Sequence, residues 1–360
     1  ISIAEISLTE AEVEAATAVL RSGNLRQGTQ CEKFESEFAR HEGAAHCMAC
    51  ANGTAALHLA YMTFLEPGDE VLIPSLTFIS TASMVSALGG IPVFVDVDRD
   101  TFLMDLDDAR SKISERTRAI VPVHLFGNVV PFDAVEELAN DNDLRIVWDA
   151  SQAHGARYRG EGLGSRADFV TWSFYPSKNM FLGEGGMVST PDREAAERLR
   201  FLRSHGETGK YLHTMLGWNY RMTDVEGAIG FEQLKRLESM VEARRRNAKL
   251  LCMGLNEVEG LRIQQQTPGS DHAWHQFGVV LEDSLGCDKA TLRARLAGRG
   301  IATGIAYPRG LHQQPVFGDQ PALPVTEWIS ERIINLPVHH GLSEMDVTYI
   351  VDAVKTVCRV

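Results

Sequence analysis

The 360-residue sequence has no apolar run close to the roughly 20 residues that an α-helix needs to cross a bilayer. Its amino terminus shows no basic stretch followed by an apolar one, so no secretory signal is predicted. Basic residues are in deficit, because 35 Lys and Arg stand against 48 Asp and Glu, giving a formal net charge of −13. Such a chain is poorly suited to non-specific binding of nucleic acid or of an anionic membrane. We therefore predict a cytoplasmic protein with neither kind of partner.

Cysteine is also scarce, with six residues scattered along the chain. Cys47 and Cys50 form a C-x-x-C pair, but no second such pair or pair of histidines completes a zinc set. Residues 46–51 read as an apolar strand that leads into a turn. We interpret the pair as reduced core cysteines, with a redox or metal-binding role as the alternative, and predict no metal site.

The first half of the chain alternates short apolar runs with stretches of helical periodicity. Strands are predicted at residues 71–74, 92–96, 119–123, 145–148 and 169–172. Helices are predicted between them at residues 55–64, 81–88, 106–113 and 132–140. This alternation indicates an α/β fold with a mostly parallel sheet covered on both faces.

The pattern changes after residue 186. A charged helix is expected at 192–205 and a long helical stretch, with a bend, at 224–254. From about residue 255 the order becomes strand, helix, strand, which indicates a smaller α+β unit. We predict a large domain of residues 1–250, including an N-terminal arm, packed closely against a small domain of residues 251–360.

Lys178 stands in the sequence SFYPSKNMFLGEGG (173–186), between two apolar runs. A desolvated lysine has a lowered pKa and becomes an amine nucleophile suited to Schiff-base chemistry. Asp149 follows the apolar run 144–148, so it falls at the carboxyl end of a predicted strand. A lysine and an aspartate on successive strand ends match what pyridoxal phosphate (PLP) requires, an imine-forming amine and a carboxylate that keeps the pyridine nitrogen protonated.

A phosphorylated cofactor needs an anion site. The turn Asn52-Gly53-Thr54 opens a predicted helix, and amide groups at a helix start with a nearby hydroxyl bind phosphate. Alone, the turn is also compatible with a simple helix cap. Ser173 follows its strand and supplies a further hydroxyl, although serine is common at strand ends.

Two more residues are candidates for contacts with the cofactor ring. Phe78 lies just past a strand end, where an aromatic side chain can stack on a planar ring or cover the core. Gln152, three residues after Asp149, can hydrogen-bond a phenolic oxygen. His154 is interpreted as a structural histidine. The glycines at 183–186 lack the spacing of a nucleotide loop and are expected to shape the turn beside Lys178.

Residues 217–222 and 307–312 each combine aromatic, polar and basic side chains. Such segments are typical of a site or a subunit interface, and a polar surface loop is the alternative.

Together these segments resemble the sugar aminotransferases of the DegT/DnrJ/EryC1/StrS family over nearly the whole chain. The similar segments are residues 22–24 with Gly28, 34–39, 51–57, 67–71, 123–127, 149–155, the Lys178 segment, 219–222, 307–308 and 311–312. The Lys178 segment with its Glu-Gly-Gly tail is the most specific of them. Ser151 stands where many relatives have alanine, a change we expect to be tolerated.

The resemblance implies the fold of aspartate aminotransferase (fold type I), with a three-layer α/β/α large domain and a small α+β domain. It also implies a homodimer with shared active sites and a role for each matching residue. Lys178 would form the internal aldimine and act as acid and base, and Asp149 would pair with the pyridine nitrogen. The expected cofactor contacts are Gly53, Thr54, Ala55 and Ser173 at the phosphate, Phe78 on the ring, Gln152 at its hydroxyl, and Asn219 at the neighbour's phosphate; Tyr307, His312 and Arg221 are the expected substrate residues.

The same resemblance implies the reaction. An amino group would pass, with glutamate as the expected donor, to the ketone of a nucleotide-linked sugar while the cofactor cycles between its pyridoxal and pyridoxamine forms. Relatives that perform dehydration carry histidine in place of the lysine, so Lys178 favours transamination. Two alternatives are an aminotransferase acting on a free cyclitol or keto-sugar and a non-catalytic regulatory protein of the same fold.

Overall fold

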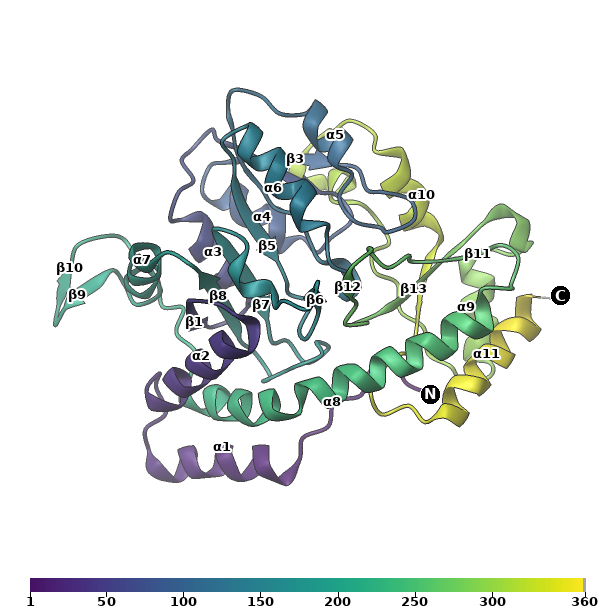
Figure 1. Ribbon diagram of the computed structural model, residues 1–360, viewed down its shortest axis with the longest axis horizontal. Helices are drawn as coiled ribbons and strands as arrows, with labels where there is room; N and C mark the ends of the chain where they lie inside the picture. The colour runs from purple at the N-terminus through teal and green to yellow at the C-terminus, as the bar shows by residue number, and fades with distance from the viewer. Residues whose placement is uncertain (359–360) are drawn as a thin grey trace.

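A seven-stranded sheet forms the centre of the larger part of the computed structural model, which describes residues 1–358 (Figure 1). Its strands, in spatial order, are β1 (His46–Cys50), β8 (Gly186–Thr190), β7 (Phe169–Ser173), β5 (Arg145–Asp149), β4 (Thr117–Ile120), β2 (Glu70–Pro74) and β3 (Ile91–Val95). The run from β7 to β3 is parallel, and β8 is antiparallel to both of its neighbours. The predicted α/β fold with a mainly parallel sheet is confirmed.

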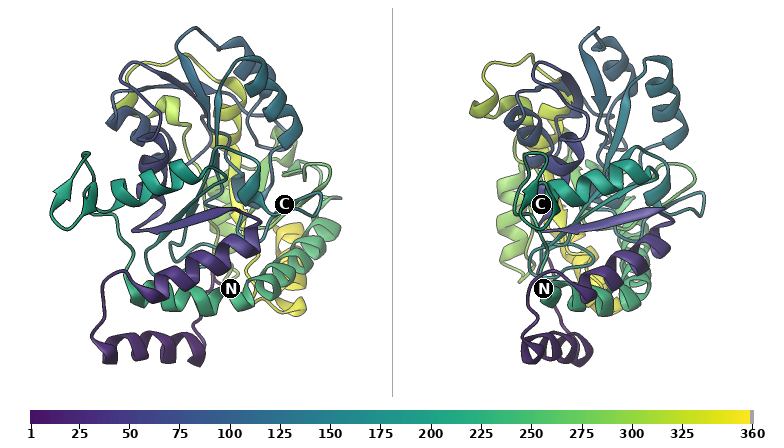
Figure 2. Two further views of the ribbon diagram at one scale, coloured as in Figure 1. Left: turned by 60° about the vertical axis from the view of Figure 1, so that its left-hand side comes forward. Right: turned by 90° about the vertical axis from the view of Figure 1, so that its left-hand side faces the viewer.

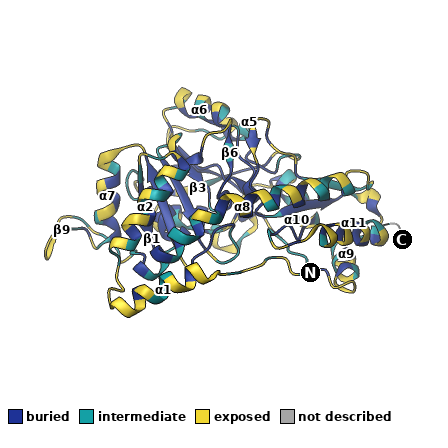
Figure 3. Ribbon diagram, turned by 60° about the horizontal axis from the view of Figure 1, so that its bottom comes forward, coloured by how far each residue is buried: buried dark blue, intermediate teal, exposed yellow. Residues whose placement is uncertain are grey.

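Both faces of this sheet are buried, which explains why its strands read as continuous apolar runs. In β5, Ile146 and Trp148 pack into one core and Val147 into the other, because successive side chains point to opposite faces. The helices of this part are α1 (Glu10–Ser22), α2 (Thr29–Glu42), α3 (Gly53–Tyr61), α4 (Ser80–Ala87), α5 (Leu106–Ser111), α6 (Phe132–Asp141) and α7 (Arg193–Arg203). The first core is covered by α2, α5 and α6, and the second by α3, α4 and α7. Figure 3 shows the buried residues gathered between these layers and the exposed ones on the outer helix faces.

Helix α8 (Asp224–Leu255) runs unbroken over 32 residues along the base of the molecule (Figure 1). It begins with a capping box, in which Thr223 and Glu226 satisfy each other's backbone amides. Its first half packs against α1 and α2, and its second half against α11 (Glu344–Cys358). The helix therefore joins the part built on the large sheet to the C-terminal part.

The C-terminal part contains an antiparallel three-stranded sheet in the order β11 (Leu261–Ile263), β13 (Phe277–Leu281) and β14 (Ile333–Leu336). Its helices are α9 (Lys289–Ala297), α10 (Pro324–Arg332) and α11 (Glu344–Cys358), and β12 (Ser270–Asp271) pairs with β6 (Arg157–Tyr158). Single 3₁₀ turns lie at Leu125–Gly127, Leu163–Ser165, Asp283–Leu285, Leu311–Gln313 and Pro315–Phe317. The first residues of the chain lie against this part, since the Ile1 carbonyl accepts a hydrogen bond from the Ala302 amide at 2.9 Å.

A small hairpin projects from the body of the molecule in two views (Figures 1 and 2). It consists of β9 (Glu207–Gly209) and β10 (Leu212–His213). Tyr211 at its tip is 84% exposed, and Leu216 just beyond it is 86% exposed. Within residues 1–358, no helix has the length and apolar character that a bilayer span demands.

Candidate active site

Several strand ends of the large sheet meet at one edge, because parallel strands place their carboxyl ends together. Strands β1, β2, β5 and β7 end there and β8 begins there. A cavity of about 540 Å³ lies at this edge. Its lining residues are Asn52, Gly53, Thr54, Thr77, Phe78, Ser80, Asp149, Ser151, Gln152, Ser173, Tyr175, Ser177, Lys178, Glu184, His275, Gln276, Ala306 and Tyr307.

The start of α3 forms one wall of the cavity. Asn52 caps the helix, its side-chain oxygen accepting a hydrogen bond from the Ala55 amide at 2.8 Å. The amides of Gly53 and Thr54 lie in the first turn, where no earlier helical carbonyl can accept a hydrogen bond from them. They therefore remain free donors at the positive end of the helix dipole. Only glycine fits at position 53, because a Cβ there would lie 2.6 Å from the Ser173 Cβ. The helix start and the end of β7 therefore make one compact anion site.

Asp149 is held in a fixed orientation at the end of β5. Its side chain is 4% exposed. One carboxylate oxygen accepts a hydrogen bond from Thr81 Oγ1 at 2.8 Å, and the other accepts from the Ser151 amide at 3.1 Å. One donor on each oxygen thus fixes the direction in which the carboxylate faces the cavity.

Lys178 lies in the loop between β7 and β8. The loop is pinned at its base, where the Phe174 amide donates to the Gly185 carbonyl at 2.8 Å and the Leu182 amide to the Phe174 carbonyl at 2.9 Å. Burial lowers the pKa of the Lys178 amine to about 8, and the nearby Asp149 carboxylate acts in the opposite direction. The amine is therefore far more available as a nucleophile near neutral pH than an ordinary lysine.

Aromatic and amide groups complete the walls. Phe78 is 55% exposed and lies with its ring centroid 6.4 Å from that of Tyr307. Gln152 receives a hydrogen bond from the Phe126 amide at 2.9 Å and donates one to the Tyr307 hydroxyl at 3.0 Å. These two bonds orient the amide of Gln152, whose nitrogen keeps a second hydrogen for another acceptor.

A model of the DegT/DnrJ/EryC1/StrS aminotransferase family matches residues 7–355. The chain belongs to this family. Its enzymes depend on PLP, and the predicted membership and fold type I are confirmed.

Family members with curated names span nearly the whole chain. A dTDP-3-amino-3,4,6-trideoxy-α-D-glucose transaminase from Streptomyces venezuelae is 38% identical over 352 residues, which are 96% of this chain and 92% of the relative. A pleiotropic regulatory protein from Geobacillus stearothermophilus is 35% identical over 344 residues, 93% of this chain and 91% of the relative. Among solved structures, S. venezuelae DesV in complex with a ketimine intermediate superposes with a TM-score of 0.93 at 36% identity, covering 97% of this chain and 94% of that one.

The cavity of this family member fits PLP. The helix start at Gly53 offers unpaired amides for a phosphate, and Asp149 is a buried, oriented carboxylate for the pyridine nitrogen. Lys178 would supply the amine, and the exposed face of Phe78 is an apolar surface that a planar ring would cover.

Four of the predicted site residues do not line this cavity. Ala55 is buried behind the turn, and its amide is taken by Asn52. His312 is buried beside the cavity wall, where its ring nitrogens lie 2.7 Å from Ser75 Oγ and 3.0 Å from a Glu327 carboxylate oxygen. Asn219 and Arg221 lie on the segment before α8, outside the cavity of their own chain.

Sequence reasoning missed lining residues and a residue behind them. Thr81 does not line the cavity but orients Asp149, and it belongs to a helix whose periodicity gives no sign of a polar contact. His275 and Gln276 come from the C-terminal part and reach the cavity only through the tertiary fold. His154, interpreted as structural, is buried between the rings of Trp172 and Phe174, and burial lowers its pKa to about 3.

Cys47 and Cys50 are free, buried residues of β1. Burial raises the pKa of Cys50 to about 12, so its thiol is unreactive. No group of side chains suited to holding a metal ion occurs among residues 1–358.

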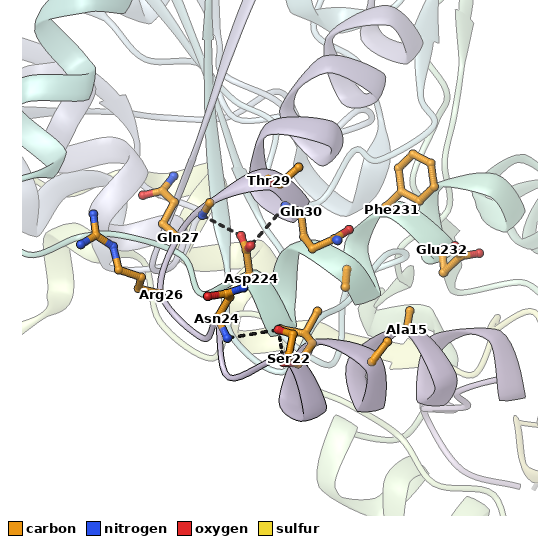
Figure 4. A pocket seen from close by; sticks show the side chains of 14 residues that line it. Ala15, Ser22, Asn24, Arg26, Gln27, Thr29, Gln30, Asp224, Phe231 and Glu232 are labelled. Carbon is orange, nitrogen blue, oxygen red and sulfur yellow. Dashed lines mark hydrogen bonds between the residues drawn. The ribbon is translucent and has the colours of Figure 1, made fainter.

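A second hollow, of about 480 Å³, lies between α1, the start of α2 and α8 (Figure 4). Its buried carboxylate, Asp224, accepts hydrogen bonds from the amides of Gly28 (2.7 Å), Cys31 (3.1 Å) and Gln30 (3.3 Å). Both carboxylate oxygens are thus already occupied by backbone donors. Asp224 ties the first residue of α8 to the start of α2, so this hollow has a structural explanation.

Proposed function

We propose that this protein transfers an amino group from an amino acid, with glutamate as the expected donor, to the ketone of a nucleotide-linked sugar. The observation that carries the proposal is the convergence of Lys178, Asp149 and the Gly53–Ser173 anion site on one cavity. The curated name of the S. venezuelae relative, a transaminase of a dTDP-linked sugar, supports the substrate class.

The side chains have separate tasks in this reaction. Bound pyridoxal phosphate supplies an electron sink for negative charge that develops on the substrate carbon. Lys178 holds the cofactor between turnovers and, once released, moves protons as acid and base. Asp149 keeps the ring nitrogen protonated, and Gly53, Thr54 and Ser173 hold the phosphate in place. Phe78 stacks on the ring.

Further residues contact the cofactor ring, face the substrate or support the cavity wall. Gln152 directs its remaining N–H toward the ring hydroxyl, and Tyr307 fixes Gln152 while facing the substrate space. Arg221 forms no ion pair within residues 1–358, so its charge is free for an anionic group. We assign His312 an indirect part, holding the wall through Ser75 and Glu327.

We also propose that the enzyme is a homodimer in which Asn219 completes the phosphate site of its neighbour. Asn219 is exposed and lies outside its own chain's cavity. The exposed apolar side chains of the β9–β10 hairpin and of the segment just after it, Tyr211, Leu212 and Leu216, suit burial in a subunit interface.

Mixing Lys178→Ala chains with Asn219→Asp chains should restore activity that both variants lack. The new carboxylate would repel the phosphate, and a mixed dimer has one site with both lesions and one with neither. Random exchange should therefore recover about one quarter of the parental activity. The matched control mixes Lys178→Ala chains with Asp149→Asn chains. Each of these lesions lies in the cavity of the chain that carries it, so both sites of a mixed dimer are damaged and no activity should be recovered. Verified mixed dimers without recovery in the first pair would contradict the shared site.

The reaction itself is tested with purified protein, PLP and a panel of nucleotide-linked 3-keto and 4-keto sugars, free keto-sugars and a keto-cyclitol, with glutamate as donor. Mass spectrometry should show an amino product from a nucleotide-linked sugar. Amination of only the free keto-sugars or the keto-cyclitol would support the alternative, an aminotransferase acting on a free cyclitol or keto-sugar. A regulatory protein, as the name of the G. stearothermophilus relative suggests for that protein, would aminate none. The intact pair of Lys178 and Asp149 favours the enzyme, because a binding module has no chemical need for it.

A further inference from the structure

A smaller chamber of about 250 Å³ opens beside the main cavity. The two spaces share Ser177, His275, Gln276 and Ala306 as lining residues. The chamber lies between the N-terminal segment, through Ile3 and Ala4, and β14 with the segment that precedes Tyr307. None of the roles proposed for the cofactor or the sugar uses this space.

A buried amide faces this chamber without a hydrogen-bond acceptor. Asn335, on β14, is 1% exposed. Its oxygen accepts from the Ala306 amide at 2.8 Å, which fixes which way the side chain points. Its Nδ2 is buried and donates to no other atom. Leaving such a donor unpaired is costly, so it is expected where a ligand supplies the acceptor.

His275 adds a second unpartnered group. It is 6% exposed, and its Nδ1 is buried without a hydrogen bond. The backbone on either side is fixed, because the His275 amide donates to the Phe126 carbonyl at 2.8 Å and the His275 carbonyl accepts from Arg244 at 3.2 Å. Burial, with the charges of Lys178 and Arg244, holds the pKa of the imidazole well below its usual range. The ring is therefore neutral and carries one N–H donor.

The charges around the chamber favour an anion. Its lining contains no carboxylate. Arg244, behind the backbone of residues 274 and 275, is 3% exposed and donates only to the carbonyls of Trp274 and His275, each at 3.2 Å. It forms no salt bridge within residues 1–358, and the carboxylate of Glu5 lies instead beside His339, 3.4 Å from its Nδ1. A buried guanidinium with only neutral partners leaves positive potential in its surroundings.

We propose that this chamber binds the distal carboxylate of a dicarboxylic amino donor, with Asn335 and His275 as its hydrogen-bond donors. The inference rests on the proposed function and names the subsite that selects glutamate. A donor whose amino group reacts in the main cavity extends its side chain past Ser177 and His275, two of the four residues that both spaces share. The carboxylate then accepts the hydrogen bonds that Asn335 and His275 lack.

The first test replaces Asn335 by aspartate in the PLP-loaded enzyme. The substitution keeps the oxygen that accepts from Ala306 and converts the free donor into a second negative oxygen. The conversion of the bound cofactor by L-glutamate and by L-glutamine is followed through its visible absorbance. The preference for glutamate over glutamine, as a ratio of kcat/KM, should fall by about tenfold or more, because the introduced carboxylate would repel the side-chain carboxylate of glutamate. Asn256→Asp, which adds the same charge at an exposed position, should leave the ratio unchanged.

The second variant, Gly304→Ala, narrows the chamber without adding charge. A Cβ at this position would lie 3.4 Å from the Asn335 Cβ and 3.6 Å from Ile3 Cγ1, which is ordinary contact, so folding should be preserved. Titration calorimetry with glutarate and butyrate then measures binding without turnover. Both variants should weaken glutarate binding and leave butyrate binding unchanged.

The outcomes separate the two proposals. If the parent reacts with no amino acid, the proposed function fails and the donor subsite with it. If the parent reacts with glutamate but both variants keep its preference and its glutarate affinity, only the subsite is overturned. A loss confined to the reaction with the keto-sugar would likewise overturn it, because the chamber would then hold the sugar.

Discussion

Lys178→Ala is expected to abolish repeated turnover, with a loss of at least about 1,000-fold, the scale of removing a positioned acid–base group. The lysine both holds the cofactor covalently and moves protons, and no other lysine lines the cavity. The phosphate and ring contacts do not depend on the amine, so the variant should still bind pyridoxamine phosphate. Steady-state turnover and cofactor binding are measured on the same preparation.

Lys178→Arg is the matched control, because arginine keeps the positive charge beside Asp149 but stays protonated near neutral pH and is not a nucleophile. Its turnover should be lost to the same extent. Borohydride reduction followed by peptide mass spectrometry should place PLP on Lys178 in the parent and on no lysine in either variant. Parental turnover in Lys178→Ala, or attachment of the cofactor elsewhere in the parent, would make the assignment wrong.

The sheet and the position of the site could be predicted because both follow from local patterns. Continuous apolar runs mark strands buried on two faces, and residues just past their ends must meet at one edge. Lys178, Asp149, Ser173 and the turn at Gly53 were found in this way, and all four line the same cavity.

Element boundaries were less accurate where capping or proline decides them. The predicted strand 119–123 ends earlier, since β4 is Thr117–Ile120. Pro122 has no N–H and interrupts the pairing, which resumes only as an isolated bridge between Val123 and Asp149. The helix predicted from residue 55 begins at Gly53, because Asn52 is its cap. The glycine itself is set by Ser173, a neighbour 120 residues away that no local pattern reveals.

The contacts that orient the site were not predictable, because each joins residues far apart in the sequence. Thr81 reaches Asp149, and Tyr307 reaches Gln152, only after the chain has folded. Asn335 gives no local sign of function, being one polar residue within an apolar strand. Its importance comes from a missing hydrogen-bond partner, which exists only in three dimensions.

Asp149→Asn is expected to slow the reaction by about 100-fold or more, the scale of losing a positioned electrostatic partner. The carboxylate keeps the pyridine nitrogen protonated, and an amide carries no charge to do so. Folding should survive. The amide oxygen can accept from the Ser151 amide as the carboxylate does, and the new NH₂ group can donate to Thr81 Oγ1, whose hydroxyl can rotate to accept it.

Thr81→Val separates orientation from charge, because it removes the hydrogen bond to Asp149 while the carboxylate remains. It should cost much less than Asp149→Asn. Thermal unfolding of the PLP-loaded proteins checks that neither variant is unfolded, and stopped-flow absorbance with glutamate measures the proton-transfer step directly. The substrate α-deuterium isotope effect should be larger in Asp149→Asn than in the parent, because proton abstraction from the substrate carbon becomes limiting. A near-parental rate in Asp149→Asn, or an equal loss in both variants, would show that the charge of this carboxylate does not drive the chemistry.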